Sequence, residues 1–367
     1  MYYSTPRRLI VPPPSPHSPF PESAMSRSAF ELSAALTLQE ARAFMEACLD
    51  PASDPAEVGR ALLAFNDRPL QGTELTAFAQ VLGERARPFH AGVRPLLDTC
   101  GTGGDARQGV HTANLSTLAA LVLARMGVDI VKHGSRAASS RCGSADLLEA
   151  LGLDLDRPQE QVEADLGRTH FAFLFAQRYH PVLGRMAPIR RALAVPTVFN
   201  MLGPLLNPAR PDFQVLGVAR EEWVEPVAQA LAAGGLRGAL VVHGLTAEGL
   251  GMDEASLEGP TLLQPVREGK LLPRLRLLPE AAGLARVPAP RMIATKAECV
   301  VLAQGVAGGQ AHPEYSVRVA EEVALQAALG LMLTRGLELG ALPGLVAEAR
   351  ATLAGGLELT ALLALAA

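Results

Sequence analysis

Residues 96–134 read LLDTCGTGGDARQGVHTANLSTLAALVLARMGVDIVKHG, and this stretch decides the fold. The apolar segment 96–99 predicts a strand, 115–126 predicts an apolar helix, and 128–131 predicts a second strand. A strand, a helix and a strand in this order are typical of a parallel α/β sheet, because parallel neighbours need a long crossover.

The pattern continues towards the carboxyl end. Further strands are expected at 171–175, 214–218 and 239–243, and further helices at 144–151, 158–168, 180–192, 221–233, 315–336 and 344–354. The run Ala239-Leu240-Val241-Val242 lacks alternation, as expected for a strand buried on both faces. The stretch 259–292 is rich in Pro, Arg and Leu without clear periodicity, and is expected to be irregular, with edge strands as the alternative.

A helical unit precedes this region. Thr37-Leu38-Gln39-Glu40 forms a capping box, and Asp54-Pro55 is a second helix start. Helices are expected at 38–49, 55–65 and 73–86. The expected domains are a disordered extension at 1–29, an α-helical domain at 30–94 joined by helices from about 178–200, and an α/β domain at 95–367. Met25 is an alternative start within the Pro-rich extension.

Composition excludes several classes. The 367 residues are 49% hydrophobic and carry a net charge of −4, so no overall positive field attracts nucleic acid. No apolar stretch is long enough for a transmembrane helix. The four cysteines, which form no CxxC pair, are expected to be free thiols in a reducing cytoplasm: Cys48, Cys100, Cys142 and Cys299. Lysine occurs only at positions 132, 270 and 296. Because lysine is so rare in this chain, each of these positions is examined for a specific role.

A glycine-rich loop, Gly101-Thr102-Gly103-Gly104-Asp105, follows the first strand. Its glycines allow loop amides to point at an anion, although such a loop can also be a simple tight turn. It is not a dinucleotide fingerprint, because Ala106 stands where the last glycine would be. Next, 114–117 (NLST) opens a helix, where Asn114 or Ser116 can cap it and an anion can share the helix dipole.

Two later segments add charge. Lys132 ends the second strand and is followed within 13 residues by two arginines and four serines, which suggests a polyphosphate or phosphate-sugar site; a solvated loop is the alternative. Asp253 and Glu254 follow another strand, and paired carboxylates beside a phosphate site are natural Mg²⁺ ligands.

Five motifs together resemble the anthranilate phosphoribosyltransferase family of tryptophan biosynthesis. They are GTGGD at 101–105, NLST at 114–117, KHGSRAASSRCGSAD at 132–146, FNMLGPLLNPA at 199–209 and GMDEASL at 251–257. Their order and spacing agree over roughly residues 35–357. The resemblance implies a nucleoside phosphorylase-like α/β fold: a small α-helical domain and a larger α/β domain with a mostly parallel central sheet. It also implies a cytoplasmic homodimer with its active site in the hinge cleft.

The implied reaction is attack of the anthranilate amine on C1 of 5-phosphoribosyl 1-diphosphate (PRPP), which releases pyrophosphate. The residues implied to bind PRPP are Gly101, Gly104, Asp105, Thr112, Asn114, Leu115, Ser116, Thr117, Lys132, His133, Gly134, Arg136, Ser139, Ser140 and Ser144. Those implied to bind anthranilate are Gly101, Ser135 and Arg190, and His133 also comes with this part of the site. Ser116, Asp253 and Glu254 are implied to hold Mg²⁺, with two ions per subunit. Lys132 is expected to stabilise the departing pyrophosphate, and no residue is assigned as a general acid or base.

Two departures from the family pattern bear on the acceptor. Ser135 stands where the family usually has Asn, and the segment 106–113 is longer than usual, which weakens the assignment of Thr112. One alternative is a related phosphoribosyltransferase or phosphorylase with another acceptor. A second is a non-catalytic relative that binds nucleic acid, against which stand the mildly acidic composition and the intact GTGGD and Asp-Glu motifs.

Overall fold

The computed structural model describes residues 35–105, 110, 113–137, 142–287, 295–309 and 316–365, so the expected extension at 1–29 lies outside it. The described residues form one nine-stranded sheet in the order β3-β2-β1-β4-β5-β7-β8, with β6 paired to β5 and β9 paired to β7. The strands are β1 Leu97–Gly101, β2 Ile130–Gly134, β3 Phe171–Phe175, β4 Phe213–Gly217, β5 Gly238–Leu245, β6 Gly251–Met252, β7 Thr261–Arg267, β8 Lys270–Leu271 and β9 Leu275–Leu277.

The first five strands are parallel, which confirms the predicted fold class. They are buried along almost their whole length, as expected for parallel strands covered on both faces. Of the two alternatives for 259–292, the structure contains strands: β7 pairs antiparallel with β5 along its length and extends the sheet. The sequence of β7 shows no regular alternation of apolar and polar residues. Pro265 lies inside this strand, and two of the strand's positions are only half-buried.

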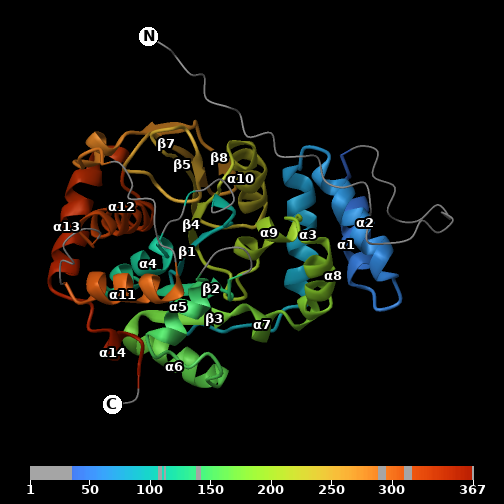
Figure 1. The fold of residues 1–367 in the computed structure, drawn as a ribbon, viewed down its shortest axis with the longest axis horizontal. Coiled ribbons are helices and arrows are strands. Elements are labelled where there is room, and N and C mark those ends of the chain that lie inside the picture. Colours follow the sequence, from blue (N-terminus) through green and yellow to red (C-terminus); the bar gives the residue numbers. More distant parts are fainter. Residues whose placement is uncertain are drawn as a thin grey trace, which may run out of the picture.

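One face of the sheet carries a large apolar core. The helices that build it are α4 Leu115–Arg125, α5 Ser144–Ala150, α11 Lys296–Ala307, α12 Ser316–Arg335 and α13 Leu342–Ala354. Figure 1 shows α12 and α13, in red, stacked at one end of the molecule; α12 and α4 pack against each other and both contact the sheet. On the opposite face α10, Val224–Ala233, packs against β5 and β7. The short helix α14, Leu359–Leu362, contacts α4, and α6, Gln159–Thr169, covers β3.

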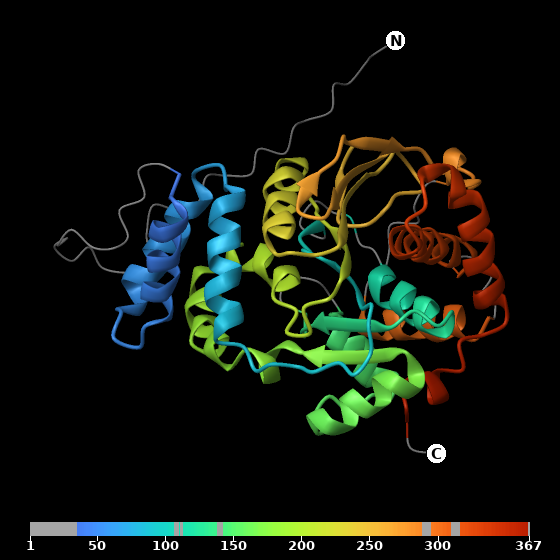
Figure 2. The same cartoon turned by 180° about the vertical axis from the view of Figure 1, so that it is seen from behind.

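The amino-terminal helices are α1 Leu38–Leu49, α2 Pro55–Asn66 and α3 Gly72–Glu84. The capping box between Thr37 and Glu40 is present, as predicted. Phe44, Phe65 and Phe78 pack together with ring centroids 4.8 to 5.8 Å apart. Helix α8, Met186–Leu193, packs on α2, and Figure 2 shows it beside the three blue helices. The division at residue 94 stays a prediction.

Two helix predictions need correction. The region expected as one helix at 180–192 contains a 3₁₀ turn at Pro181–Gly184 followed by α8, and the short helix α7, Ala176–Tyr179, precedes it. Pro181 explains the break, because proline cannot donate a hydrogen bond within a helix. The helix expected at 221–233 begins with a 3₁₀ turn at Glu221–Trp223 before α10, and α11 was not expected at all.

No helix in the described part of the chain combines the length and apolar character that crossing a membrane requires.

Candidate active site

The order of the strands places a crevice at the carboxyl end of β1. The chain runs from β1 through β2 to β3 on one side, and β4 and β5 follow on the other side of β1. Open α/β sheets bind ligands outside the carboxyl ends of the strands at such a switch point. The strands β1 and β2 pair only at Leu97 and Ile130, so they diverge towards their carboxyl ends. A cleft of about 880 Å³ opens there.

Most residues predicted from sequence to form the site lie together in this cleft. They are Gly101, Asp105, Asn114, Ser116, Thr117, Lys132, His133, Gly134, Ser135, Arg136, Ser144, Arg190, Asp253 and Glu254. Gly104 and Leu115 are not among the residues that line it, and the Leu115 side chain lies in the core. Thr112, Ser139 and Ser140 lie outside the described residues.

The glycines of the 101–105 loop serve its conformation and the approach of a second loop. Gly103 and Gly104 have φ values of +66° and +103°, a region that favours glycine. The Gly103 amide donates to Asp253 Oδ2 at 2.7 Å. A Cβ atom on Gly217, at the end of β4, would lie 1.6 Å from the Asp253 carbonyl oxygen. These glycines therefore let the 251–257 segment bring its carboxylates to the ends of β1 and β4.

Lys132 lies in the gap between the diverging strands. Its side chain is 2% exposed, and Nζ donates to the Thr99 carbonyl and, at 3.4 Å, to Ser116 Oγ. Ser116 belongs to the first turn of α4, and its amide donates to Glu254 Oε1 at 3.3 Å. One buried cation, the start of a helix and a carboxylate thus meet at one point, at the edge of the sheet.

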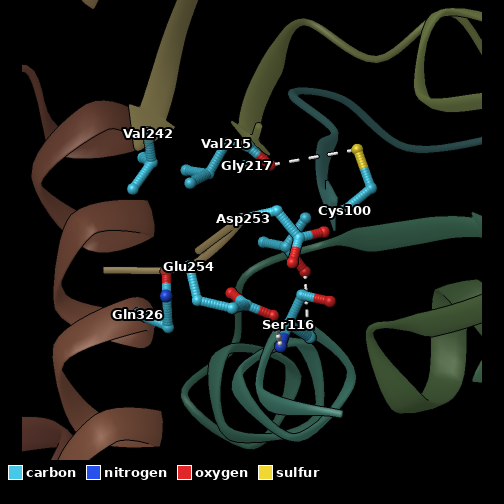
Figure 3. A pocket seen from close by; sticks show the side chains of 9 residues that line it. Cys100, Ser116, Val215, Gly217, Val242, Asp253, Glu254 and Gln326 are labelled. Carbon is cyan, nitrogen blue, oxygen red and sulfur yellow. Dashed lines mark hydrogen bonds between the residues drawn. The ribbon is translucent and has the colours of Figure 1, made fainter. Parts of the chain in front are cut away.

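The Asp253 and Glu254 carboxyl groups are buried together. Burial raises the pKa of each well above its usual range; the nearby Asp105 carboxylate adds to this for Asp253, as the Asp253 carboxylate does for Glu254. Figure 3 shows Glu254 lying between Ser116 of α4 and Gln326 of α12, with Asp253 close by. The Lys132 charge offsets only part of this effect for Glu254. Acidic oxygens packed this closely favour binding of a hard divalent ion.

The donor set fits Mg²⁺ with help from a ligand. Within the described ranges, no three His, Cys, Asp or Glu side chains converge as a complete metal site. Mg²⁺ is characteristically held by one or two carboxylates together with waters and substrate phosphates, rather than by a full protein cage. Asp253, Glu254 and the Ser116 hydroxyl are suited to such a partial site.

The start of α4 is open towards the cleft. Asn114 is its N-cap residue but makes no capping hydrogen bond with its side chain, so capping by Asn114 is wrong. Its Nδ2 instead donates to Cys299 Sγ at 3.5 Å. The positive end of the α4 dipole is therefore directed at the cleft without a cap from its own N-cap residue, although the Ser116 amide donates to Glu254.

The segment after β2 is held at its base by Asp146. Asp146 Oδ2 accepts hydrogen bonds from the amides of Ala137 at 2.9 Å and Gly143 at 3.0 Å. The Arg136 guanidinium lines the cleft but binds Glu149 at 2.6 Å and Asp146 at 3.3 Å. The Ser135 side chain is exposed, and its hydroxyl donates to the Arg136 carbonyl at 3.1 Å.

Arg190 projects into the opposite wall of the cleft from α8. It is half-buried, and burial lowers its pKa. Its guanidinium lies over the Phe199 ring at 5.7 Å and donates only a long hydrogen bond, 3.4 Å, to Asn200 Oδ1. A poorly paired, half-buried cation beside an aromatic ring is suited to the carboxylate of an aromatic acid.

Two histidines lie between these walls. His133 Nδ1 donates to the Gly203 carbonyl at 3.3 Å, and His180 Nε2 donates to the Leu206 carbonyl at 2.8 Å. The rings lie 5.1 Å apart, and the buried His133 Nε2 and His180 Nδ1 have no partner among the described residues. Burial lowers the pKa of both, that of His133 to about 3, so both rings are neutral acceptors. His180 was missed from sequence because no local motif surrounds it.

Comparisons with known proteins agree with this geometry. Residues 93–357 match the family described as "Glycosyl transferase family, a/b domain". The chain is 46% identical, over 68% of its length and 70% of the relative's, to anthranilate phosphoribosyltransferase of Synechococcus sp. strain WH7803. The crystal structure of that enzyme from Thermus thermophilus matches with a TM-score of 0.79 and 42% identity, over 90% of this chain and 96% of the other. The Saccharomyces cerevisiae enzyme in complex with PRPP and Mg matches with a TM-score of 0.75 and 26% identity, over 89% and 90%.

Proposed function

The chain belongs to the anthranilate phosphoribosyltransferases, and we infer that it transfers the 5-phosphoribosyl group of PRPP to the amine of anthranilate. The products are N-(5-phosphoribosyl)anthranilate and pyrophosphate, and the reaction is the second step of tryptophan biosynthesis from chorismate. The protein is thus a pentosyltransferase, and the two walls of its cleft correspond to its two substrates.

The diphosphate of PRPP is assigned to the sheet edge. Positive charge and backbone amides converge on one region of the cleft. They come from the start of α4, from the loop at 101–105 and from Lys132. Gly134 and Ser144 line the same end, after β2. This arrangement supports the proposed PRPP contacts, including those of Gly104 and Leu115 through the backbone.

Anthranilate is assigned to the wall formed by α8 and the 199–209 segment. Arg190 supplies the cation for its carboxylate, and Phe199 contributes an aromatic surface. The free acceptors His133 Nε2 and His180 Nδ1 are suited to the N–H groups of the aromatic amine. The Ser135 hydroxyl donates to the Arg136 carbonyl. We therefore assign to the two histidines and Arg190 the contact with anthranilate that the family's Asn makes.

The chemistry needs charge stabilisation more than base catalysis. The amine of anthranilate is neutral at pH 7, and breaking the bond at C1 develops oxocarbenium character on the sugar and charge on pyrophosphate. Lys132 and the α4 amides stabilise the departing charge. His133, whose pKa is about 3, is too weak a base to drive the attack, so it orients the amine.

Mg²⁺ is the proposed cofactor, with two ions per subunit. When bound, it neutralises charge on the diphosphate as a Lewis acid. Asp253, Glu254 and Ser116 would hold it, and the raised pKa values of the two buried carboxyl groups support this assignment. The assembly is proposed to be a cytoplasmic homodimer, which sedimentation equilibrium of the purified protein tests.

The observation that carries the proposal is the placement of Lys132 and Arg190, two buried or half-buried cations, on opposite walls of one cleft. The test incubates the purified protein with PRPP, Mg²⁺ and anthranilate and follows anthranilate fluorescence. Fluorescence should fall only when PRPP is present, and chelation of Mg²⁺ should stop the change. No PRPP-dependent change, with binding of single-stranded DNA instead, would reject the function.

Lys132→Ala provides a second arm of this test. It should lower kcat by about 100-fold, because it removes the buried cation beside the leaving group. Lys270→Ala is the matched control: Lys270 lies on the exposed strand β8, and its loss should leave the rate unchanged.

A further inference from the structure

Two of the four cysteines meet at the diphosphate end of the cleft. Cys142 lies at the end of the segment that follows β2, two residues before the start of α5. Cys299 lies on α11. Both side chains line the cleft, and their thiols are hydrogen-bonded to each other. The two segments are far apart in sequence, so the fold itself brings the thiols together.

Cys142 and Cys299 have different surroundings, which shift the pKa values of their thiols in opposite directions. Asn114 Nδ2 donates to Cys299 Sγ at 3.5 Å, and Lys296 lies 3.7 Å from Asp146 near Cys142. The hydrogen bond from Cys299 and the Lys296 charge lower the pKa of Cys142, against burial and the Asp146 charge. The pKa of Cys299 is raised, chiefly by the Cys142 thiol and by burial. Cys142 is therefore the better nucleophile, with Cys299 placed to react with it.

The other thiols lack these features. Burial raises the pKa of Cys48 to about 12 and that of Cys100 well above its usual value. Cys48 lies inside the helical unit, away from the cleft. Reactive cysteines need thiolate character and a resolving partner. Cys142 and Cys299 are themselves buried, but they line the cleft and have each other as partner, a combination that neither Cys48 nor Cys100 has.

We propose that Cys142 and Cys299 form an oxidation site at which a hydroperoxide produces a disulfide that disables the diphosphate end of the cleft. The Cys142 thiolate attacks the terminal oxygen of the hydroperoxide, the O–O bond breaks, and the alcohol (water from hydrogen peroxide) leaves with a proton. The Cys299 thiol then attacks the sulfenic sulfur, and the displaced hydroxide takes the Cys299 proton and leaves as water. Two thiols lose two electrons in total, which reduce the hydroperoxide.

The disulfide changes the geometry around bound diphosphate. A disulfide holds its sulfurs about 2.05 Å apart, closer than two hydrogen-bonded thiols, so the 142–144 backbone and α11 must approach each other. The backbone at Gly143 is closely packed, because a Cβ atom there would lie 2.4 Å from the Ala137 amide nitrogen and 2.6 Å from the Ser135 carbonyl oxygen. Asn114, beside the metal-facing Ser116, also loses its thiol partner. This effect on PRPP, unlike formation of the bond, rests on the proposed function.

The experiment treats the reduced full-length protein with hydrogen peroxide and divides each sample. One half is alkylated and digested without reductant, and the peptides are identified by mass spectrometry. The other half is assayed for PRPP-dependent pyrophosphate release before and after dithiothreitol. Cys142→Ser and Cys299→Ser are compared, each with its own untreated sample, and Cys48→Ala is the control.

We expect a peptide pair linked through Cys142 and Cys299, and a rise of roughly tenfold in the KM for PRPP that dithiothreitol reverses. Neither serine variant should form the link or lose activity reversibly, whereas Cys48→Ala should behave like the unaltered protein. Absence of the linked peptide, or the same reversible loss in both serine variants, overturns the proposal. If the untreated protein releases no pyrophosphate, the proposed function fails, while peptide mapping still decides the disulfide.

Discussion

Lys132 and Arg190 are cations that the fold keeps from full hydration, and each has weak or backbone partners. Lys132 bonds to a carbonyl and a hydroxyl, and Arg190 has only a long contact to Asn200. A cation in this state gains more from an anionic ligand than a hydrated surface cation does. Lys132 and Arg190 can therefore bind anionic groups at two defined positions in the cleft. The net charge of the whole chain, −4, gives no indication of these local positive charges.

Replacement of Arg190 tests its role on the acceptor side. Arg190→Ala should raise the KM for anthranilate by about tenfold or more, because a charge-assisted bond to the carboxylate is lost. The KM for PRPP should change little. Steady-state kinetics with each substrate varied separately measures both, with the exposed Arg220→Ala as control. An equal rise in both KM values would contradict a specific contact between Arg190 and the anthranilate carboxylate.

His133 predicts a pH dependence of stability. Its folded pKa is about 3, against about 6.5 in an unfolded chain, so the unfolded state binds the extra proton between these values. The free energy of unfolding contributed by His133 is therefore complete above about pH 6.5 and is lost as the pH falls towards 3. His133→Gln, which keeps a donor but cannot titrate, should lose less stability than the unaltered protein between about pH 7 and pH 5 in urea titrations. Equal losses would contradict the lowered pKa.

Single residues differ in how far sequence could predict them. Lys132 was expected directly after the second strand and lies inside β2, whereas Asp253 and Glu254 follow β6. The order of apolar strands and polar residues in the sequence was enough to predict that the three lie near one edge of the sheet. Arg190 has no such signal and was found only through family resemblance. His180 was missed, because its role depends on the 3₁₀ turn after it and on its packing against His133.

At the scale of elements, the ends of β1 and β4 are shaped by glycine so that the 251–257 segment can approach. The closest approach is at Gly217, where any Cβ atom collides with the Asp253 backbone. Strand ends built from small residues therefore set the position of the carboxylates.

Gly217→Ala should displace Asp253 while leaving the sheet folded. The Mg²⁺ concentration for half-maximal activity should rise roughly tenfold, because the carboxylates no longer hold their positions. Activity against Mg²⁺ concentration measures this, and circular dichroism checks the fold. Gly83→Ala is the control, since a Cβ there meets no atom within 4 Å. An unchanged Mg²⁺ dependence would mean that Asp253 does not position the ion.

Elements with strong periodicity or caps were predictable, and those set by distant contacts were not. The parallel strands and α1 follow from apolar runs and the Thr37 capping box. Strand β7 depends on pairing with β5, which a segment containing Pro265 does not indicate by itself. Helix α11 was missed although Thr295 and Glu298 form a capping box, which is the signal that could have found it.

At the scale of the whole molecule, the two binding walls come from different parts of the architecture. The wall proposed to bind the diphosphate lies at the edge of the sheet, whereas Arg190 lies on α8, which packs on α2 of the helical unit. Figures 1 and 2 show this unit and the sheet side by side, with α8 beside the amino-terminal helices and α9 (Phe199–Leu202) between α3 and the sheet. A change in the angle between them would alter the distance between the two substrates and the access of water.

The central claim is that this cleft joins the two substrates instead of hydrolysing PRPP. The most direct measurement is the ratio of pyrophosphate released to anthranilate consumed in one reaction with Mg²⁺. The account predicts equal amounts and no pyrophosphate release when anthranilate is omitted. Release of pyrophosphate without consumption of anthranilate would contradict it.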